Sequence, residues 1–189
     1  MILILNGSPK KSGKVATLLR AVEKGLKEKG RQVEWMNVYD LKIAPCIACM
    51  KCRPDGRCIL PEDGGHFAGD KIAACGGLVV GTPTHWGNMS AQLKMLFDRN
   101  VPVFMGEKPN GFPIPRQKGK PALIVTACTT PWPFNFIAAE SRGAIHAVRE
   151  VLHYGGIKIK GRLALPGTKS MEKIPQRFLD RACKLGRKL

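Results

Sequence analysis

The chain has 189 residues, of which 44% are hydrophobic and 24% are charged, and a formal net charge of +17. This balance is that of a globular domain and argues against disorder, and the longest apolar runs, 2–5 and 78–80, are too short to cross a bilayer. The basic excess can attract polyanions, acidic proteins and phosphorylated ligands, but the basic residues are dispersed without aromatic interleaving. We therefore expect one domain, 1–189, with no membrane partner and no nucleic-acid partner.

The N-terminal segment lacks the order of a secretory signal, because Lys10 and Lys11 follow its apolar run instead of preceding it. We therefore expect a cytoplasmic protein with reduced thiols. Seven cysteines in that compartment indicate metal, redox or core residues and not disulfides. Cys75 and Cys183 lie in apolar helical patterns and are expected in the core.

Strands and helices alternate along the chain. Strands are predicted at 1–7, 32–38, 77–81, 122–126 and 158–165, and helices at 15–29, 62–74, 88–99, 137–152 and 174–185. Strands separated by helices imply an α/β fold with a parallel sheet covered on both faces. Five such strands fit the order 2-1-3-4-5, in which ligands bind at the carboxyl ends of the strands where the order reverses. The Pro/Gly-rich segment 101–120 is expected to be an excursion that serves as an interface or a lid.

The turn after the first strand, NGSPKKSGKV, is a candidate phosphate loop. Gly, Ser and Lys between a strand and a helix N-terminus supply N–H donors, hydroxyls and positive charge. A Walker A loop does not fit, because five residues separate Gly7 from Gly13 and Val15 replaces the hydroxyl residue that would hold magnesium. A G-x-G-x-x-G fingerprint is absent too. The loop fits the phosphate of a mononucleotide, and an unliganded basic turn is the alternative.

Two further loops are expected beside this one. The third strand leads into GTPTHWGNMSAQLKMLFDR and the fourth into TACTTPWPFNF, each with small hydroxyl residues and an aromatic residue. A flat isoalloxazine ring needs a backbone ledge for its polar edge and apolar cover for its faces. A lone Trp86 or Trp132 would more often be a core residue, but three loops at one sheet edge favour a flavin site.

Four cysteines follow the second strand in PCIACMKCRPDGRC, with the spacing C-x2-C-x2-C-x5-C. Four thiolates at this spacing can bind a [4Fe–4S] cluster. Structural zinc sites more often pair two C-x2-C knuckles across a long gap, and a C-x2-C pair can also be a redox dithiol. The cluster, a dithiol or unligated loop, and zinc therefore all remain open. The candidate metal ligands are Cys46, Cys49, Cys52 and Cys58.

The segments GSPKKSGK, PCIACMKCRPDGRC, GTPTHWGNMSAQLKMLFDR and HYGGIKIKGRLALPGT together resemble the NAD(P)H-dependent FMN reductase superfamily of flavodoxin-like proteins. The cysteine run resembles the iron–sulfur flavoprotein branch of that superfamily. The resemblance covers about residues 1–168. It implies a flavodoxin-like three-layer sandwich and bound FMN, and it implies association as a homodimer or homotetramer.

The resemblance also implies where FMN binds. The phosphate would be surrounded by Ser8, Lys10, Ser12, Lys14, Val15 and Ala16. The ring would be bordered by Pro83, Thr84, His85, Trp86, Gly87 and Asn88, and on its other side by Cys128, Thr129 and Thr130. His85 is the candidate catalytic residue, as a flavin-positioning group or proton donor, whereas His66, His146 and His153 are expected to be structural.

The predicted function is that of an FMN-dependent oxidoreductase with FMN, a [4Fe–4S] cluster and NAD(P)H as cofactors. Electrons would pass from NAD(P)H or a ferredoxin-like donor through FMN to an acceptor, which is a small molecule or a protein. One alternative is a non-enzymatic electron-transfer protein with FMN and a cluster. The other is a basic nucleic-acid-binding domain with a zinc knuckle.

Overall fold

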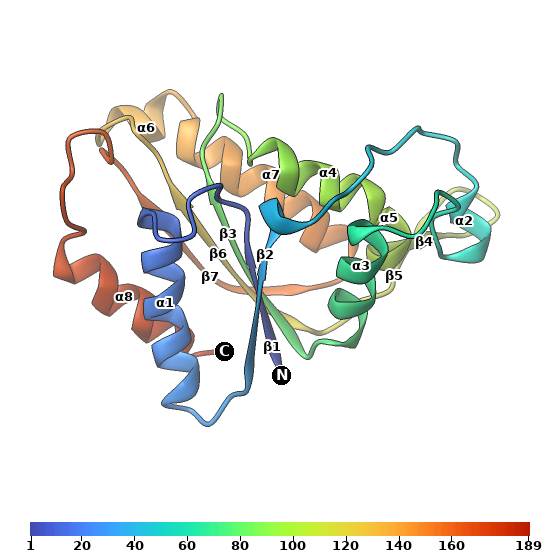
Figure 1. Ribbon diagram of the computed structural model, residues 1–189, viewed down its shortest axis with the longest axis horizontal. Coiled ribbons are helices and arrows are strands. Elements are labelled where there is room, and N and C mark those ends of the chain that lie inside the picture. Colours follow the sequence, from blue (N-terminus) through green and yellow to red (C-terminus); the bar gives the residue numbers. More distant parts are fainter.

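The structure is a computed structural model that describes residues 1–189, apart from the side chains of Pro54 and Asp55. Its centre is a five-stranded parallel sheet in the order β2-β1-β3-β6-β7, which confirms the predicted α/β fold and strand order (Figure 1). The strands are β1 (Ile2–Asn6), β2 (Val33–Asn37), β3 (Gly77–Pro83), β6 (Pro121–Ala127) and β7 (Lys158–Leu165). The central strands are buried along almost their whole length because both of their faces are covered by helices.

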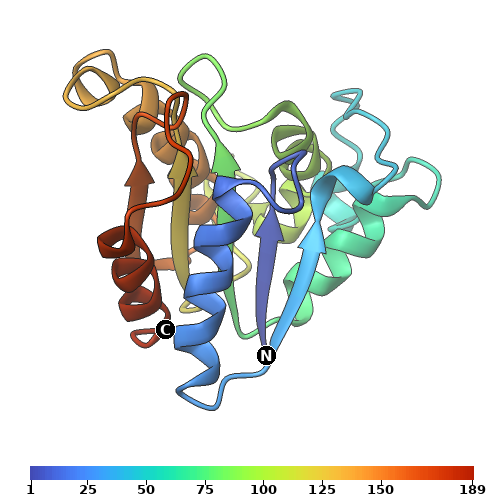
Figure 2. The same cartoon turned by 60° about the vertical axis from the view of Figure 1, so that its left-hand side comes forward.

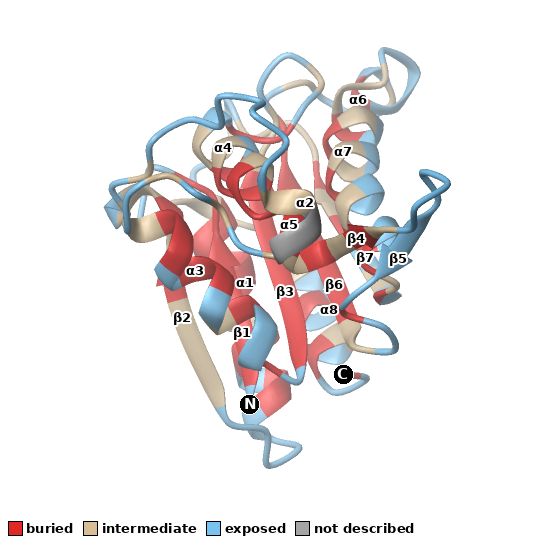
Figure 3. Ribbon diagram, turned by 90° about the vertical axis from the view of Figure 1, so that its right-hand side faces the viewer, coloured by how far each residue is buried: buried red, intermediate tan, exposed pale blue. Residues whose placement is uncertain are grey.

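Helices form a layer on each face of the sheet (Figure 2). α1 (Lys14–Lys27) and α8 (Gln176–Gly186) pack on one face, where Ile4, Leu19 and Val79 belong to one buried cluster. The opposite face is covered mainly by α3 (Gly64–Ala74), α4 (Ala91–Arg99) and α7 (Glu140–Tyr154), over a second cluster. The burial pattern in Figure 3 follows this arrangement, with buried strands between half-buried helices. None of the helices that the structure describes is long and apolar enough to span a membrane.

Short elements lie in the connections. They are η1 (Val38–Asp40), α2 (Cys52–Asp55), α5 (Val101–Phe104), β4 (Met105–Glu107), β5 (Pro113–Pro115) and α6 (Phe134–Ile137). The predicted excursion at 101–120 therefore contains a helical turn and the antiparallel hairpin β4–β5. It is attached to the cysteine loop by an ion pair between Arg53 and Glu107.

The start of the long helix after β6 was predicted wrongly. Ile137 is 68% exposed and ends α6, whereas the buried face of α7 begins at Ser141. The cause is Ala139, whose backbone lies in the left-handed region with a φ of 59°. The chain therefore changes direction between α6 and α7. By contrast, Cys75 and Cys183 are buried as predicted.

Candidate functional site

Three loops meet at the carboxyl edge of the sheet. They follow β1, β3 and β6, which are adjacent in the sheet, and Figure 2 shows them side by side above the strands. Parallel strands end at the same edge, so residues far apart in the sequence come together there. The three predicted loops therefore lie at the same edge of the sheet.

The loop after β1 presents free donors at a helix N-terminus. Its bends are fixed by hydrogen bonds from Lys10 N to Ser8 Oγ at 3.2 Å and from Gly13 N to Lys10 O at 3.1 Å. The first backbone bond of α1 runs from Thr17 N to Gly13 O at 2.9 Å. The amides that precede Thr17 in the helix therefore have no acceptor within α1. The first turn of α1, which the structure describes completely, has no acidic residue, so the loop is suited to an anion.

Ser90 joins the phosphate loop to the loop after β3. Its Oγ donates to the Gly7 carbonyl at 2.6 Å, and its backbone N donates to Thr82 Oγ1 at 2.9 Å. Gly7 N in turn donates to Gly81 O at 2.7 Å. Because Ser90 is fully buried, these bonds are shielded from water. The two loops are thus fixed relative to each other.

The loop after β3 ends in a tight turn. His85 and Asn88 exchange two backbone hydrogen bonds of 2.9 Å, and Trp86 and Gly87 between them have φ values of 51° and 67°. Two central residues with positive φ are the signature of a type I′ turn. The Trp86 side chain projects fully into solvent, while α7 supports the turn from below, where Gly143 faces the carbonyl of Gly87.

The loop after β6 lies against the same turn. Thr84 N donates to Ala127 O at 2.9 Å, and the Thr84 and Thr126 hydroxyls are 3.1 Å apart. Cys128 is buried, and its thiol lies 3.6 Å from Glu140 Oε2. Cys128 is therefore held inside the loop and not at its surface.

An open cavity of about 660 Å³ lies between these two loops and the N-termini of α4 and α7. Its lining includes five of the predicted ring residues: Thr84, His85, Trp86, Asn88 and Thr129. Four other lining residues were not predicted from the sequence: Met89, Ala91, Lys94 and Glu140. In the part of the chain that the structure describes, the cavity does not reach the phosphate-loop residues or Pro83, Gly87, Cys128 and Thr130.

The four cysteines of the 46–58 loop border one cavity of about 330 Å³. Cys46 and Cys49 are exposed, and Cys52 and Cys58 are half-buried. Burial raises the pKa of the Cys52 thiol, and the charges of Cys58 and the other two cysteines raise it further. The four thiols therefore lie around one shared cavity.

Among the side chains that the structure describes, no three Cys, His, Asp or Glu groups converge closely enough to hold a single metal ion. A tetrahedral zinc ion needs such convergence, with sulfur atoms about 2.3 Å from the metal. A [4Fe–4S] cluster takes one thiolate at each iron, so its ligands are spread around it. Four thiols around one cavity are compatible with one thiolate ligand for each iron of a cluster.

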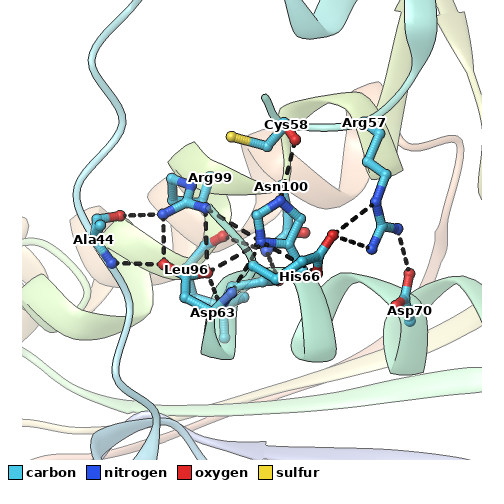
Figure 4. Close-up of polar contacts among 11 residues, drawn as sticks. Ala44, Arg57, Cys58, Asp63, His66, Asp70, Leu96, Arg99 and Asn100 are labelled. Atoms are coloured by element: carbon cyan, nitrogen blue, oxygen red, sulfur yellow. Dashed lines mark hydrogen bonds and ion pairs between the residues drawn. The ribbon is translucent and has the colours of Figure 1, made fainter. Parts of the chain in front are cut away.

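A polar network around the buried side chains of Arg99 and His66 adjoins this cavity, which Arg99 lines (Figure 4). Asp63 is the N-cap of α3, and its side chain accepts hydrogen bonds from Gly65 N, Ala44 N and Arg99. Burial would raise the pKa of Asp63, but the bonds from the Ala44 amide, the Arg99 guanidinium and the Gly65 amide outweigh it and lower the pKa to about 2. His66 completes a capping box with Asp63, so its predicted structural role is confirmed.

The Asp63→Asn variant is expected to lose a pH-dependent part of the stability. A carboxyl with a lowered pKa in the folded state stabilises the fold above its unfolded pKa of about 3.9. This stabilisation disappears as the pH falls toward about 2. At neutral pH we expect the variant to lose about 1–3 kcal/mol of unfolding free energy, because Arg99 loses its ionic partner. Urea unfolding between pH 5 and pH 2.5 should show a shallower decline for the variant than for the wild type.

Asp70→Asn is the matched control, since Asp70 is exposed on the same helix and pairs with the exposed Arg57. Exposed ion pairs contribute little to stability. Identical slopes for wild type and Asp63→Asn would contradict the assigned role of Asp63.

Comparison with known proteins supports the fold and the family. The model of the NADPH-dependent FMN reductase family matches residues 1–148. An iron–sulfur flavoprotein of Methanocaldococcus jannaschii is 32% identical over 105 residues, 56% of this chain and 54% of that protein. The chain spans about half the length of the curated relatives it matches.

Two solved structures have a similar fold. An NAD(P)H:quinone oxidoreductase from Methanothermobacter marburgensis aligns with a TM-score of 0.75 at 18% identity, over 98% of this chain and 94% of that one. An FMN-dependent NADH-azoreductase from Bacillus anthracis, in complex with FMN, aligns with a TM-score of 0.69 at 16% identity, over 98% and 95%. Because the family model covers well over half of the sequence, the chain belongs to the NADPH-dependent FMN reductase family.

Proposed function

We propose that this protein is an FMN-dependent oxidoreductase in which the cysteine loop binds a [4Fe–4S] cluster. Electrons enter from NAD(P)H or a ferredoxin-like donor and leave to an acceptor through FMN. The flavin supplies the redox chemistry when bound, and the protein positions it and sets its electrostatic surroundings. The basic surface, with a net charge of +17, favours acidic redox partners.

The observation that carries this proposal is the position of α4. Ala91 and Lys94, near its N-terminus, line the cavity beside the ring loops, and Asp98 and Arg99, at its C-terminus, line the cysteine cavity. The rise of an α-helix separates Ala91 from Arg99 by about 12 Å along its axis. One short helix therefore connects the cavity beside the ring loops with the cavity of the four thiols.

The chain's own groups have distinct roles in this proposal. The phosphate would be bound by the free amides at the start of α1 and by the side chains of Lys10 and Ser12. The ring would lie in the open cavity beside Thr84, His85 and Thr129. His85, exposed at the base of the turn, positions the flavin edge or donates a proton to it.

The Ser12→Asp variant tests the flavin site. Ser12 is exposed, so the substitution adds one negative charge to the phosphate loop without disturbing the core. Repulsion between this charge and a phosphate of charge about −2 at about 6 Å in water is about 1.4 kcal/mol. We therefore expect FMN to bind at least tenfold more weakly, whereas riboflavin, which lacks the phosphate, should bind as before. Quenching of flavin fluorescence measures both affinities.

Asn110→Asp is the control, because it adds the same charge at the exposed tip of the β4–β5 hairpin. Equal affinities of wild type and Ser12→Asp for FMN would rule out the assigned phosphate loop. A wild-type protein that binds neither flavin would refute the proposed function as a whole. Steady-state oxidation of NADH and NADPH then separates the enzyme from a pure electron carrier, which would show no turnover with either nucleotide.

A further inference from the structure

Arg99 is a buried cation held from several sides. It is the last residue of α4 and is only 2% exposed. Nη1 and Nη2 donate to the two carboxylate oxygens of Asp63 at 2.8 and 3.1 Å, and Nη1 also donates to the carbonyl of Ala44 at 2.6 Å (Figure 4). A charge is tolerated at such a position only when it is paired and hydrogen-bonded. These bonds hold the Arg99 guanidinium, the Asp63 carboxylate and the Ala44 carbonyl in one fixed arrangement.

The groups around Arg99 hold the start of the cysteine loop. Ala44 lies two residues before Cys46, and both of its backbone groups are bound. Its N–H donates to Asp63 Oδ2 at 2.9 Å, and its carbonyl accepts the bond from Arg99. The chain therefore enters the loop at a fixed point.

The same network holds the end of the loop. His66 is buried, and its Nε2 lies 3.1 Å from the carbonyl of Cys58. The Asp63 amide donates to Nδ1 at 3.3 Å, and Arg99 Nη2 points at the same atom from 3.5 Å. The carbonyl of Cys58 can only accept, so Nε2 is the donor of this bond, and the carboxylate Oδ1 of Asp63 lies 3.3 Å from Nδ1. Asp63, His66 and Arg99 together bridge the two ends of the loop.

The guanidinium also faces the thiols. Arg99 borders the same cavity as the four cysteines. Burial lowers the pKa of Arg99, but the Asp63 carboxylate and the Cys58 thiol more than compensate and raise it above its usual value. Within the described part of the chain, the buried Nε of Arg99 has no hydrogen-bond partner, so one donor remains free.

We propose that Arg99 is a positioning residue that closes the cysteine loop at both ends before any metal binds and places a fixed positive charge beside the thiols. The role of the charge rests on the proposed function, since it concerns the cluster. The closure of the loop does not depend on it. A reduced cluster carries one more negative charge than an oxidised one, so a fixed cation stabilises the reduced form.

Hydrogen exchange in the metal-free protein tests the closure. In Arg99→Gln the carboxylate of Asp63 loses its partner and the carbonyl of Ala44 loses its donor. We expect the hydrogen-bonded amides of the loop, such as those of Ala44, Arg53 and Gly56, to exchange at least tenfold faster than in the wild type. Arg57→Gln removes the same charge from within the loop, but Arg57 is exposed and pairs only with Glu62 and Asp70 among the described residues. This control should exchange as the wild type does.

Redox titration of the iron-loaded protein, followed by electron paramagnetic resonance, tests the charge. Arg99→Gln should weaken the preference for the reduced form about tenfold, which is a shift of about 59 mV to lower potential for a one-electron couple. Arg99→Lys retains the charge without the two-nitrogen fork that joins Ala44 to Asp63. It should therefore keep a potential close to that of the wild type and still show accelerated exchange of the loop. Arg99→Lys also replaces Arg99→Gln if the latter does not fold.

The outcomes separate the two parts of the proposal. Unchanged exchange in the Arg99 variants, or equal acceleration in Arg57→Gln, would overturn the closure. An unchanged potential in Arg99→Gln, or the same shift in Arg99→Lys, would overturn the role of the charge. An anaerobic wild type without iron would refute the cluster of the proposed function, while the exchange experiment would still decide the closure.

Discussion

Cys49→Ser protein prepared without oxygen is expected to contain almost no iron and sulfide, whereas the wild type should contain about four of each per chain. Cys49 is the central thiol of the x2-spaced run and borders the cavity shared by all four cysteines. A serine hydroxyl is a far poorer ligand for iron than a thiolate, because it remains protonated at neutral pH. Iron, sulfide and zinc analysis of the purified proteins measures the result.

Ile47→Ser is the matched control for this loop. Ile47 is 61% exposed and lines the same cavity, but it has no group that could bind iron. Its replacement should leave the iron content unchanged. Equal iron in wild type and Cys49→Ser would refute the assigned ligand, and zinc in place of iron would favour a zinc knuckle.

Gly143→Ala is expected to weaken the binding of FMN and riboflavin alike, at least tenfold. A Cβ at this position would clash with the carbonyl oxygen of Gly87, far inside the ordinary contact distance. Neither atom can turn away, because one belongs to α7 and the other to the backbone of the Trp86–Gly87 turn. The turn must therefore shift from α7, at a cost of about 1–3 kcal/mol of unfolding free energy.

This variant complements the charge substitution in the phosphate loop. Ser12→Asp should affect only the flavin with a phosphate, whereas a displaced ring loop should affect both flavins. His146→Ala serves as the control, since His146 is exposed on the same helix. If Gly143→Ala binds riboflavin as the wild type does, the ring does not lie against this turn.

Local patterns predicted the sheet and its binding edge. The apolar runs of β1, β3 and β6 identify buried parallel strands, and their order then brings three loops together without further information. Thr84, His85 and Thr129, which the family resemblance implies as ring residues, line the cavity at that edge. Lys94 and Glu140 were missed because each lies on a helix that begins after the loop, and its approach to the cavity depends on how that helix packs.

The network beneath the cysteines could not be predicted from the sequence. Asp63 and Arg99 are 36 positions apart, and their pairing depends on the packing of α3 against the end of α4. Only the capping box at the start of α3 has a local pattern in the sequence. His66 follows Asp63 by three residues, which is the spacing of a capping box. The break at Ala139 was equally hidden, since alanine normally favours the helix that it interrupts here.

The hydrogen bonds of Ser90 have a thermodynamic consequence for ligand binding. Ordering a loop around a ligand costs conformational entropy, and that cost is subtracted from the affinity. Here Ser90 has already fixed the loop after β1 to the loop after β3, so this entropy is lost when the chain folds. A mononucleotide that enters the site would therefore meet two loops already held together, and no further ordering of these loops would be subtracted from its binding free energy.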